Sequence, residues 1–340
     1  MKKGTKTVLI TAIVMILTGG IMSTICLVLG ANWNDTGLFH RWGFRSSNYE
    51  EGRIDAVQEQ AYAGEATGVL EGTGMREDSN AAHYEEADGD FLWWSWTEGI
   101  DSLDLSVDVG EMIVQQGSEF RVEVEYPRDK FRCEVKDGTL IVDEDDWNMT
   151  WGFFQGEHPV IWVTIPEDWS FEKVKCDVGA GSMEVCQLMA NTLEIDVDAG
   201  SFTAEGIVAK EKMSLDVDAG SADIFGGVCQ GKLSADVDAG SAYLESFEGK
   251  TASFDVDAGS LDYSGILEGD WKADCDVGSI TMVLSAEEAD YNYLIESDMG
   301  GVAIGGKSFS GISDHSKVEN KASWTASIDC DMGSVEVSFE

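Results

Sequence analysis

Apolar and acidic residues alternate along short segments between Cys176 and Ser279, and each segment ends in Gly-Ser. In the segment Leu193–Asp198, the leucine, isoleucine and valine take every second position, and Glu194, Asp196 and Asp198 take the positions between. A period of two is typical of a β-strand with one buried face and one face in water. Apolar positions that recur every three or four residues, as in a helix, are not seen in these segments.

This segment recurs six times at an almost constant step. The copies read CDVGAGS, then DVDAGS four times, then DCDVGS, and neighbouring copies are 19 or 20 residues apart. The turn glycines are Gly181, Gly200, Gly220, Gly240, Gly259 and Gly278. Such a period predicts one structural unit stacked on itself. We expect glycine at the turn because it tolerates positive φ.

A second short strand is predicted after each serine, because the residue that follows the serine is always apolar, as in Phe202, Ala222 and Leu261. Two or three short strands in about 20 residues predict an all-β fold, a parallel β-solenoid in which equivalent residues stack about 4.8 Å apart. A β-sandwich is the alternative fold, but it gives no reason for so regular a step.

Weaker copies lie on both sides of the regular ones, at Leu105–Gly110, Glu296–Gly300 and Asp329–Ser334. We therefore predict irregular cap strands and first coils over residues 91–171. The regular solenoid is predicted over residues 172–340, with an inserted loop near 305–320. Terminal repeats are usually atypical because they close the stack.

The N-terminal part predicts a membrane anchor. Lysines in a tail of residues 1–6 precede an uncharged, mostly apolar run, Val8–Gly30, that is long enough to span a bilayer as a helix. The positive-inside rule then predicts a single-pass protein of the cell membrane, with the helix at 7–30 and an extracytoplasmic C-terminal domain. A cleaved signal peptide is the alternative. Residues 31–90 show no period and predict a flexible acidic linker.

Charge and cysteine content limit the classes of partner and the disulfides that the chain can have. The formal net charge of −42 excludes nucleic acid as a natural partner and disfavours anionic lipid headgroups. The seven cysteines form no CxxC pair. Cys176, Cys275 and Cys330 fall on inward positions of the strand pattern, which favours buried free thiols; a lone disulfide between stacked coils is the alternative.

In-register stacking would arrange the aspartates in two columns, one on the strands from Asp177 onward and one at the turns. Carboxylates about 5 Å apart repel by nearly 1 kcal/mol in water. Some favourable interaction must therefore compensate the repulsion within the columns. One hypothesis is that Ca²⁺, the one cofactor we consider, bridges them. The other is that they bond to turn backbone, maintain solubility and block stacking between molecules. The candidate cation ligands are Asp196, Asp198, Asp216, Asp218, Asp236, Asp238, Asp255, Asp257, Asp274 and Asp276.

Aromatic residues are concentrated before the regular coils, and Trp93, Trp94 and Trp96 stand out. We interpret these rings as a lid that covers the open end of the solenoid core. The alternative is a surface for a partner, such as the sugars of a wall polymer.

The coils, together with the segments Ile100–Val114 and Val160–Pro166, resemble the DUF4097 family, which is also labelled putative adhesin and described as β-strand-repeat proteins. The resemblance covers about Ile100–Phe339. Family members are typically bacterial, often membrane-tethered and sometimes associated with cell-envelope stress systems, and the resemblance implies the same kind of protein here. It brings no catalytic residues.

Catalytic motifs are absent from the sequence. The four histidines are far apart, no arginine follows Arg132, and no GxSxG or phosphate-binding loop occurs. The sequence predicts a non-catalytic, adhesin-like or envelope-associated protein. Its partners would be the membrane, through the N-terminal helix, and an envelope polymer or membrane protein. A Ca²⁺-binding structural rod is the alternative, and a carbohydrate-active β-helix enzyme is the third.

Overall fold

The computed structural model describes residues 82–85, 91–126, 131–144, 158–309 and 314–340. Within these ranges every element is a β-strand except one 3₁₀ turn, Glu288–Asp290, which confirms the all-β prediction. None of the described helical segments is long and apolar enough to cross a membrane. The predicted tail (1–6), the predicted membrane helix (7–30) and most of the predicted linker (31–90) lie outside the described residues.

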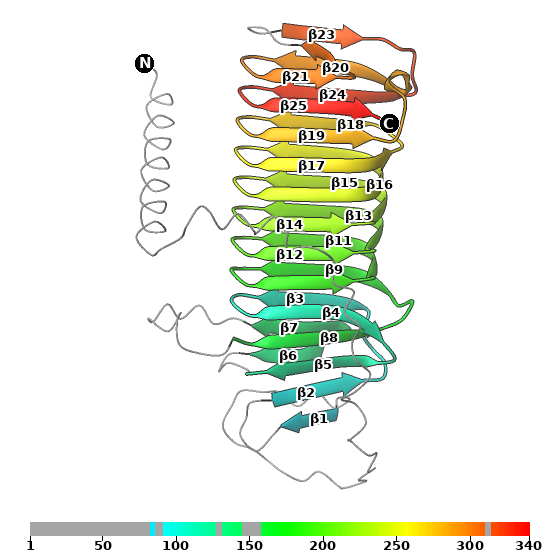
Figure 1. The fold of residues 1–340 in the computed structure, drawn as a ribbon. Coiled ribbons are helices and arrows are strands. Elements are labelled where there is room, and N and C mark those ends of the chain that lie inside the picture. Colours follow the sequence, from blue (N-terminus) through cyan, green and yellow to red (C-terminus); the bar gives the residue numbers. More distant parts are fainter. Residues whose placement is uncertain (1–81, 86–90, 127–130, 145–157, 310–313) are drawn as a thin grey trace, which may run out of the picture. The chain divides into compact units, whose positions relative to one another are not determined.

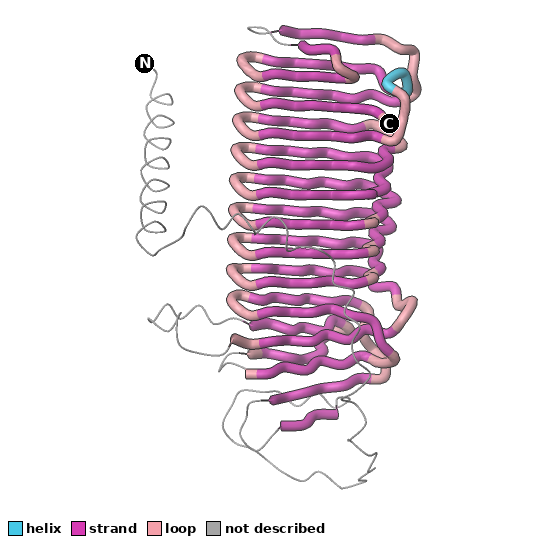
Figure 2. The backbone as a smooth tube through the Cα atoms, in the orientation of Figure 1, coloured by secondary structure: helices cyan, strands magenta, loops and turns pink. Residues whose placement is uncertain are grey.

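Each regular coil contains a long strand, a tight turn and a short strand, and the coils stack in parallel (Figures 1 and 2). We call the strands before each turn the long strands, since most have nine or ten residues; β18 has only five. They are β9 (Ser170–Val178), β11 (Met189–Val197), β13 (Val208–Val217), β15 (Val228–Val237), the second half of β16 (Ser241–Val256) and β18 (Trp271–Cys275). The short strands are β10 (Ser182–Cys186), β12 (Ser201–Glu205), β14 (Ser221–Phe225), the first half of β16, β17 (Ser260–Leu267) and β19 (Ser279–Leu284). Equivalent residues of neighbouring copies are register partners, as the repeat predicts.

The core lies between the long strands and the short strands. Ile195, Leu215 and Ala235 are consecutive register partners on the long strands, and all three are buried. Across from them, the apolar residues that follow each serine are also buried, including Phe202 and Leu261. Burial of one face of every strand removes apolar surface from water at about 25 cal/mol per Å², which explains the strict alternation along the chain.

The order of the coils in space differs from their order in the sequence at both ends of the stack (Figure 1). The coil of β3 (Ser102–Val107) and β4 (Glu111–Gly117) lies between the strands β7 (Thr139–Glu144) and β8 (Val160–Pro166) on one side and β9 and β10 on the other. The last coil, β24 (Trp324–Cys330) and β25 (Ser334–Phe339), lies between β18/β19 and the coil of β20 (Tyr291–Ser297) and β21 (Gly301–Ile304). At the N-terminal end the chain runs outward from β3 and β4 to β7 and β8 and then crosses back to β9. At the C-terminal end it skips one position, which β24 and β25 later fill.

Antiparallel strands cover both ends of the parallel stack. One end carries β1 (Ala82–Glu85), β2 (Phe91–Trp96), β5 (Phe120–Glu125) and β6 (Arg132–Lys136); the other carries β22 (Lys307–Phe309) and β23 (Asp314–Val318). Thus β1 falls within the predicted linker, and β22 and β23 fall in the segment predicted as an inserted loop. Covering strands protect the parallel stack from pairing with other chains.

Two of the three tryptophans singled out in the sequence are part of the core. Trp94 and Trp96 of β2 are 6% and 2% exposed, and the Trp94 ring packs 5.6 Å from the ring of Phe131. Trp93 points to the other face of β2, where the guanidinium of Arg121 lies 4.9 Å from the centre of its ring. Strand alternation thus separates the three side chains onto two faces.

The turn glycines are required for a reason different from the one expected. None of the six predicted turn glycines has a positive φ, so that explanation was wrong. Instead, the turns stack so closely that a Cβ on Gly220 would lie 2.5 Å from the carbonyl oxygen of Gly200 and 2.7 Å from Cγ1 of Val197. Any side chain at this position would force neighbouring coils apart.

Candidate functional site

The strand aspartates form the predicted column. Register pairing joins Asp196 to Asp216 and Asp216 to Asp236, and the series runs on without a break. We call this set the first column; its members are Asp177, Asp196, Asp216, Asp236, Asp255, Asp274, Asp329 and Glu296. The last two extend the column beyond the sequence prediction, through the coils that lie out of sequence order.

The turn aspartates form a second column beside the first. The amide of Ala219 donates to the carbonyl of Asp198 at 2.7 Å, and the amide of Ala239 donates to that of Asp218 at the same distance, so the turns stack in register. The second column contains Asp198, Asp218, Asp238, Asp257, Asp276, Asp331 and Asp298. We call the two columns together the acidic strip.

The carboxyl groups of the first column disfavour ionisation. Partial burial is the main reason that the pKa of Asp216 lies above its ordinary value, and the charges of Asp196 and Asp236 raise it further. The pKa values of Asp196, Asp236 and Asp255 are also raised, mainly by partial burial and further by the charges of nearby aspartates, which for Asp236 are those at the turns. Stacking therefore imposes an electrostatic cost that grows with each added copy.

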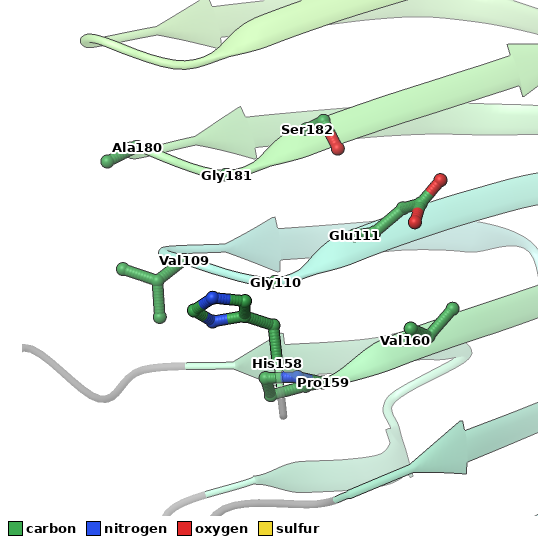
Figure 3. A pocket seen from close by; sticks show the side chains of 9 residues that line it. All are labelled: Val109, Gly110, Glu111, His158, Pro159, Val160, Ala180, Gly181 and Ser182. Carbon is green, nitrogen blue, oxygen red and sulfur yellow. The ribbon is translucent and has the colours of Figure 1, made fainter. Parts of the chain in front are cut away.

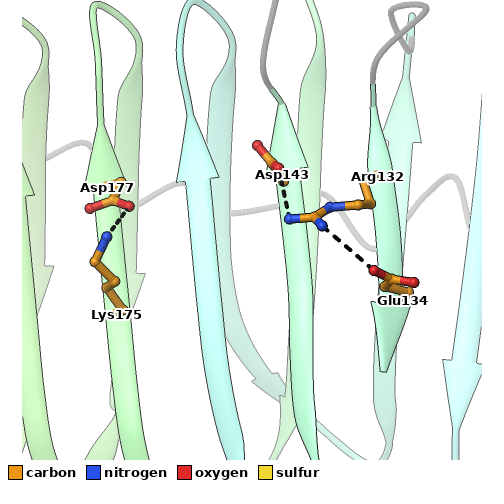
Figure 4. Close-up of polar contacts among 5 residues, drawn as sticks. All are labelled: Arg132, Glu134, Asp143, Lys175 and Asp177. Carbon is orange, nitrogen blue, oxygen red and sulfur yellow. Dashed lines mark hydrogen bonds and ion pairs between the residues drawn. The ribbon is translucent and has the colours of Figure 1, made fainter. Parts of the chain in front are cut away.

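Lysines compensate the first column only near its ends. Lys175 Nζ lies 2.5 Å from Asp177 Oδ2 (Figure 4), and Lys272 forms an ion pair with Asp274. At the N-terminal end of the stack, Arg132 Nη2 similarly pairs with Asp143 at 3.0 Å, which joins β6 to β7 (Figure 4). Among the described residues, no ion pair reaches the aspartates between Asp177 and Asp274, so the middle of the strip keeps its negative charge.

Two further lysines of the long strands form a separate column. Lys212 and Lys232 are register partners, four positions before Asp216 and Asp236 on the same strands. Four residues of strand correspond to about 13 Å, so these ammonium groups lie on the same face but away from the strip. A row of serines, with Ser214 and Ser234 in register, lies between the two columns of charge.

The aspartates are aligned but do not converge on one point. In the part of the chain that the structure describes, no three histidine, cysteine, aspartate or glutamate side chains are grouped so that they would hold a metal ion. The candidate Ca²⁺ ligands thus stand in two rows at the strand spacing of about 4.8 Å. Bridging by a cation would need neighbouring carboxylates to turn toward one another, with water completing the coordination.

A shallow hollow of about 350 Å³ lies where β4, β8 and β10 begin (Figure 3). His158, Glu111 and Ser182 are among its lining residues. The side chains of these three described residues form no hydrogen bond or ion pair with one another, so they do not make a nucleophile–base pair as placed here. The hollow is part of the outer surface at the turns.

One buried carboxylate escaped the sequence analysis. Glu144 is 1% exposed, and its Oε2 accepts hydrogen bonds from the backbone amides of Asp108 and Val109, both at 3.0 Å. In the regular coils the preceding turn supplies carbonyl acceptors at these positions. Glu144 therefore completes the turn ladder where the regular turns end. Its sequence context, an Asp-Glu-Asp-Asp run, predicts a solvent-exposed side chain.

Comparison with models of protein families shows which family this chain belongs to. The family model of DUF4097, described as Toastrack, matches residues 100–338. The chain belongs to this family. DUF4097 is therefore confirmed over nearly the whole range of the resemblance seen in the sequence. No functionally curated protein matches the chain.

Two solved structures are similar to this DUF4097 chain. A putative adhesin from Bacteroides fragilis is 13% identical, with a TM-score of 0.46, over 73% of this chain and 96% of that one. A putative cell adhesion protein from Clostridium sporogenes is also 13% identical, with a TM-score of 0.26, over 76% of this chain and 100% of that one.

Proposed function

We propose that this DUF4097 protein is a non-catalytic, adhesin-like binding protein, tethered to the cell membrane and displayed outside the cytoplasm. The acidic strip is its binding surface, and its partner is a component of the cell envelope that carries positive charges at regular intervals. The tether is the apolar run Val8–Gly30, preceded by lysines.

The observation that carries the proposal is the in-register first column, in which the negative charges of the middle aspartates are not paired with cations. Asp196, Asp216, Asp236 and Asp255 follow one another at the strand spacing without an ion pair among the described residues. Their raised pKa values reflect the cost of ionising partly buried carboxylates that lie close to one another. A partner with spaced cations would relieve this cost and gain affinity and on-rate from complementary charge.

The test compares two full-length variants with equal charge. The strip variant carries Asp→Asn at Asp196, Asp216, Asp236 and Asp255. The control variant carries Glu184→Gln, Glu205→Gln, Glu245→Gln and Asp262→Asn, whose side chains lie outward on the short strands. Co-sedimentation with isolated cell envelopes should fall at least tenfold for the strip variant and stay near the native level for the control.

Equal retention of the two variants would contradict the proposal, because it would mean that net charge or another surface governs binding. Retention should also weaken as salt rises, since exposed charges are screened beyond about 8–10 Å at physiological ionic strength. Turnover of an envelope polysaccharide by the purified protein would contradict the non-catalytic part of the proposal and favour the carbohydrate-active alternative.

A Ca²⁺-binding structural rod is the second candidate, and the alignment of the two columns is what favours it. Ca²⁺ that binds only the folded protein would raise Tm, and the increase would continue with the logarithm of the Ca²⁺ concentration above Kd. Melting the native protein in chelator and in millimolar Ca²⁺ tests this candidate. An increase that disappears in the strip variant would support a rod, and an unchanged Tm would exclude bridging.

A further inference from the structure

Two cysteines meet where the chain returns to fill its last position in the stack. Cys275 at the end of β18 and Cys330 at the end of β24 are register partners, and they are 1% and 0% exposed. In the preceding coils the same inward position is held by valine, as at Val237 and Val256. Cysteine thus replaces valine on two coils that are adjacent in space but 55 residues apart in sequence.

The two thiols lie close enough for each to shift the pKa of the other. The Cys330 thiol donates to the carbonyl of Gly301 at 3.9 Å. Neighbouring parallel strands are about 4.8 Å apart, which is within the Cα separation of 4.4–6.8 Å that a disulfide spans. Turning one thiol toward the other is the main adjustment that a bond requires.

No other pair of described cysteines has this relationship. Cys176 pairs in register with Ile195 and Leu105, and Cys229 pairs with Ala209 and Gly249. Cys186 lies opposite Glu205, and Cys133 lies opposite Val142. The described part of the chain therefore contains one cysteine pair with matched register.

We propose that Cys275 and Cys330 form a disulfide that locks the last coil into the stack. The two thiols lose two electrons and two protons to a small disulfide oxidant such as oxidised glutathione, which is reduced to two thiols, while one S–S bond forms. The reaction passes through a mixed disulfide on one cysteine, which the thiolate of the other cysteine then attacks. An oxidising compartment outside the cytoplasm would favour the bond.

Burial determines when the bond forms. Both sulfurs are shielded from solvent in the complete stack, and burial raises the pKa of the Cys275 thiol to about 11. The folded, reduced protein should therefore react slowly with the oxidant. The bond should form readily while β24 and β25 are still undocked, since the sulfurs are then accessible.

The experiment refolds full-length reduced protein in a mixture of reduced and oxidised glutathione. Peptide mass spectrometry without reductant should then find the Cys275 and Cys330 peptides linked, 2 Da lighter than the two separate peptides. The oxidised protein should melt about 5–15 °C higher than the reduced protein, because the link closes a long loop. This test uses purified protein and does not depend on where the protein resides.

Cys275→Val and Cys330→Val are matched controls, because valine is the residue of the preceding coils at this position. Each variant should fold and should show no difference in Tm between oxidising and reducing conditions. The proposal would be overturned if refolded wild-type protein retained alkylatable thiols at both positions, or if its bond joined other cysteines.

Discussion

Asp216 and Asp236 are register partners on the adjacent parallel strands β13 and β15, with outward carboxylates and no ion pair to either side chain in the described part of the chain. Two unit charges about 5 Å apart in water repel by nearly 1 kcal/mol before salt screening. The same relationship repeats along the first column, so the strip that we propose for binding is also a source of instability.

Asp236→Asn should therefore stabilise the protein. Removal of one charge from the middle of the first column relieves repulsion from both neighbours, and we expect a gain of about 0.5–1 kcal/mol, or about 1–4 °C in Tm. Asp262→Asn is the control, because its register partners are Tyr243 and Thr281 and are not acidic. A Tm gain of the same size in both variants would indicate a general effect of net charge.

Lowering the pH should also stabilise the fold. The raised pKa values of Asp196, Asp216, Asp236 and Asp255 mean that the folded state takes up protons at a higher pH than the unfolded state does. The free energy of unfolding therefore decreases as the pH rises from the ordinary pKa near 3.8 to the higher pKa of the folded state. It increases again when the pH is lowered through the same range. Thermal melting between pH 7 and pH 4 should show Tm rising toward the lower part of this range.

The four-Asn strip variant is the control for this pH dependence. Its Tm should rise less on acidification than that of the native protein, because the four titrating groups are gone. If the native protein and the strip variant gave parallel profiles, the column would not be the source of the pH dependence.

Gly220→Ala should be strongly destabilising. The added Cβ would lie 2.5 Å from the carbonyl oxygen of Gly200, so the two turns would have to separate, and we expect a loss of about 1–3 kcal/mol or more. Gly301→Ala is the matched control, since nothing lies within 4 Å of its added Cβ. Urea unfolding of the two variants measures the difference, and equal midpoints would contradict the close stacking of turns.

Glu144→Ala should loosen the first turn of the ladder. It removes the carboxylate that accepts from the amides of Asp108 and Val109. The Asp108 amide keeps the backbone carbonyl of residue 144 at 3.1 Å, but the Val109 amide loses its acceptor, and an unsatisfied buried donor costs about 1–3 kcal/mol. Glu144→Gln retains an acceptor oxygen and should lose less. Hydrogen exchange at the amide of Val109 reports the change directly, and unchanged protection in the alanine variant would contradict the assigned role.

The regular coils were predictable from the sequence because each DVDAGS copy specifies its own inward and outward positions. Asp196 through Asp276 then align by repetition alone. The order of the final coils was not predictable, since Glu296–Gly300 and Asp329–Ser334 carry the same local pattern and either one would fit on β18. Glu144 was missed because its burial depends on a distant turn.

Distances between spin labels on outward positions test the stacking most directly. Glu194, Lys272, Ser327 and Leu294 belong to one register column, in that spatial order. With about 4.8 Å per coil, the backbone separation from position 194 should be about 19 Å to position 272, about 24 Å to 327 and about 29 Å to 294. Pulsed electron resonance on three double-cysteine variants should reproduce this increasing order. A shorter distance to 294 than to 327, or distances without a common step, would contradict the in-register solenoid with its returning last coil.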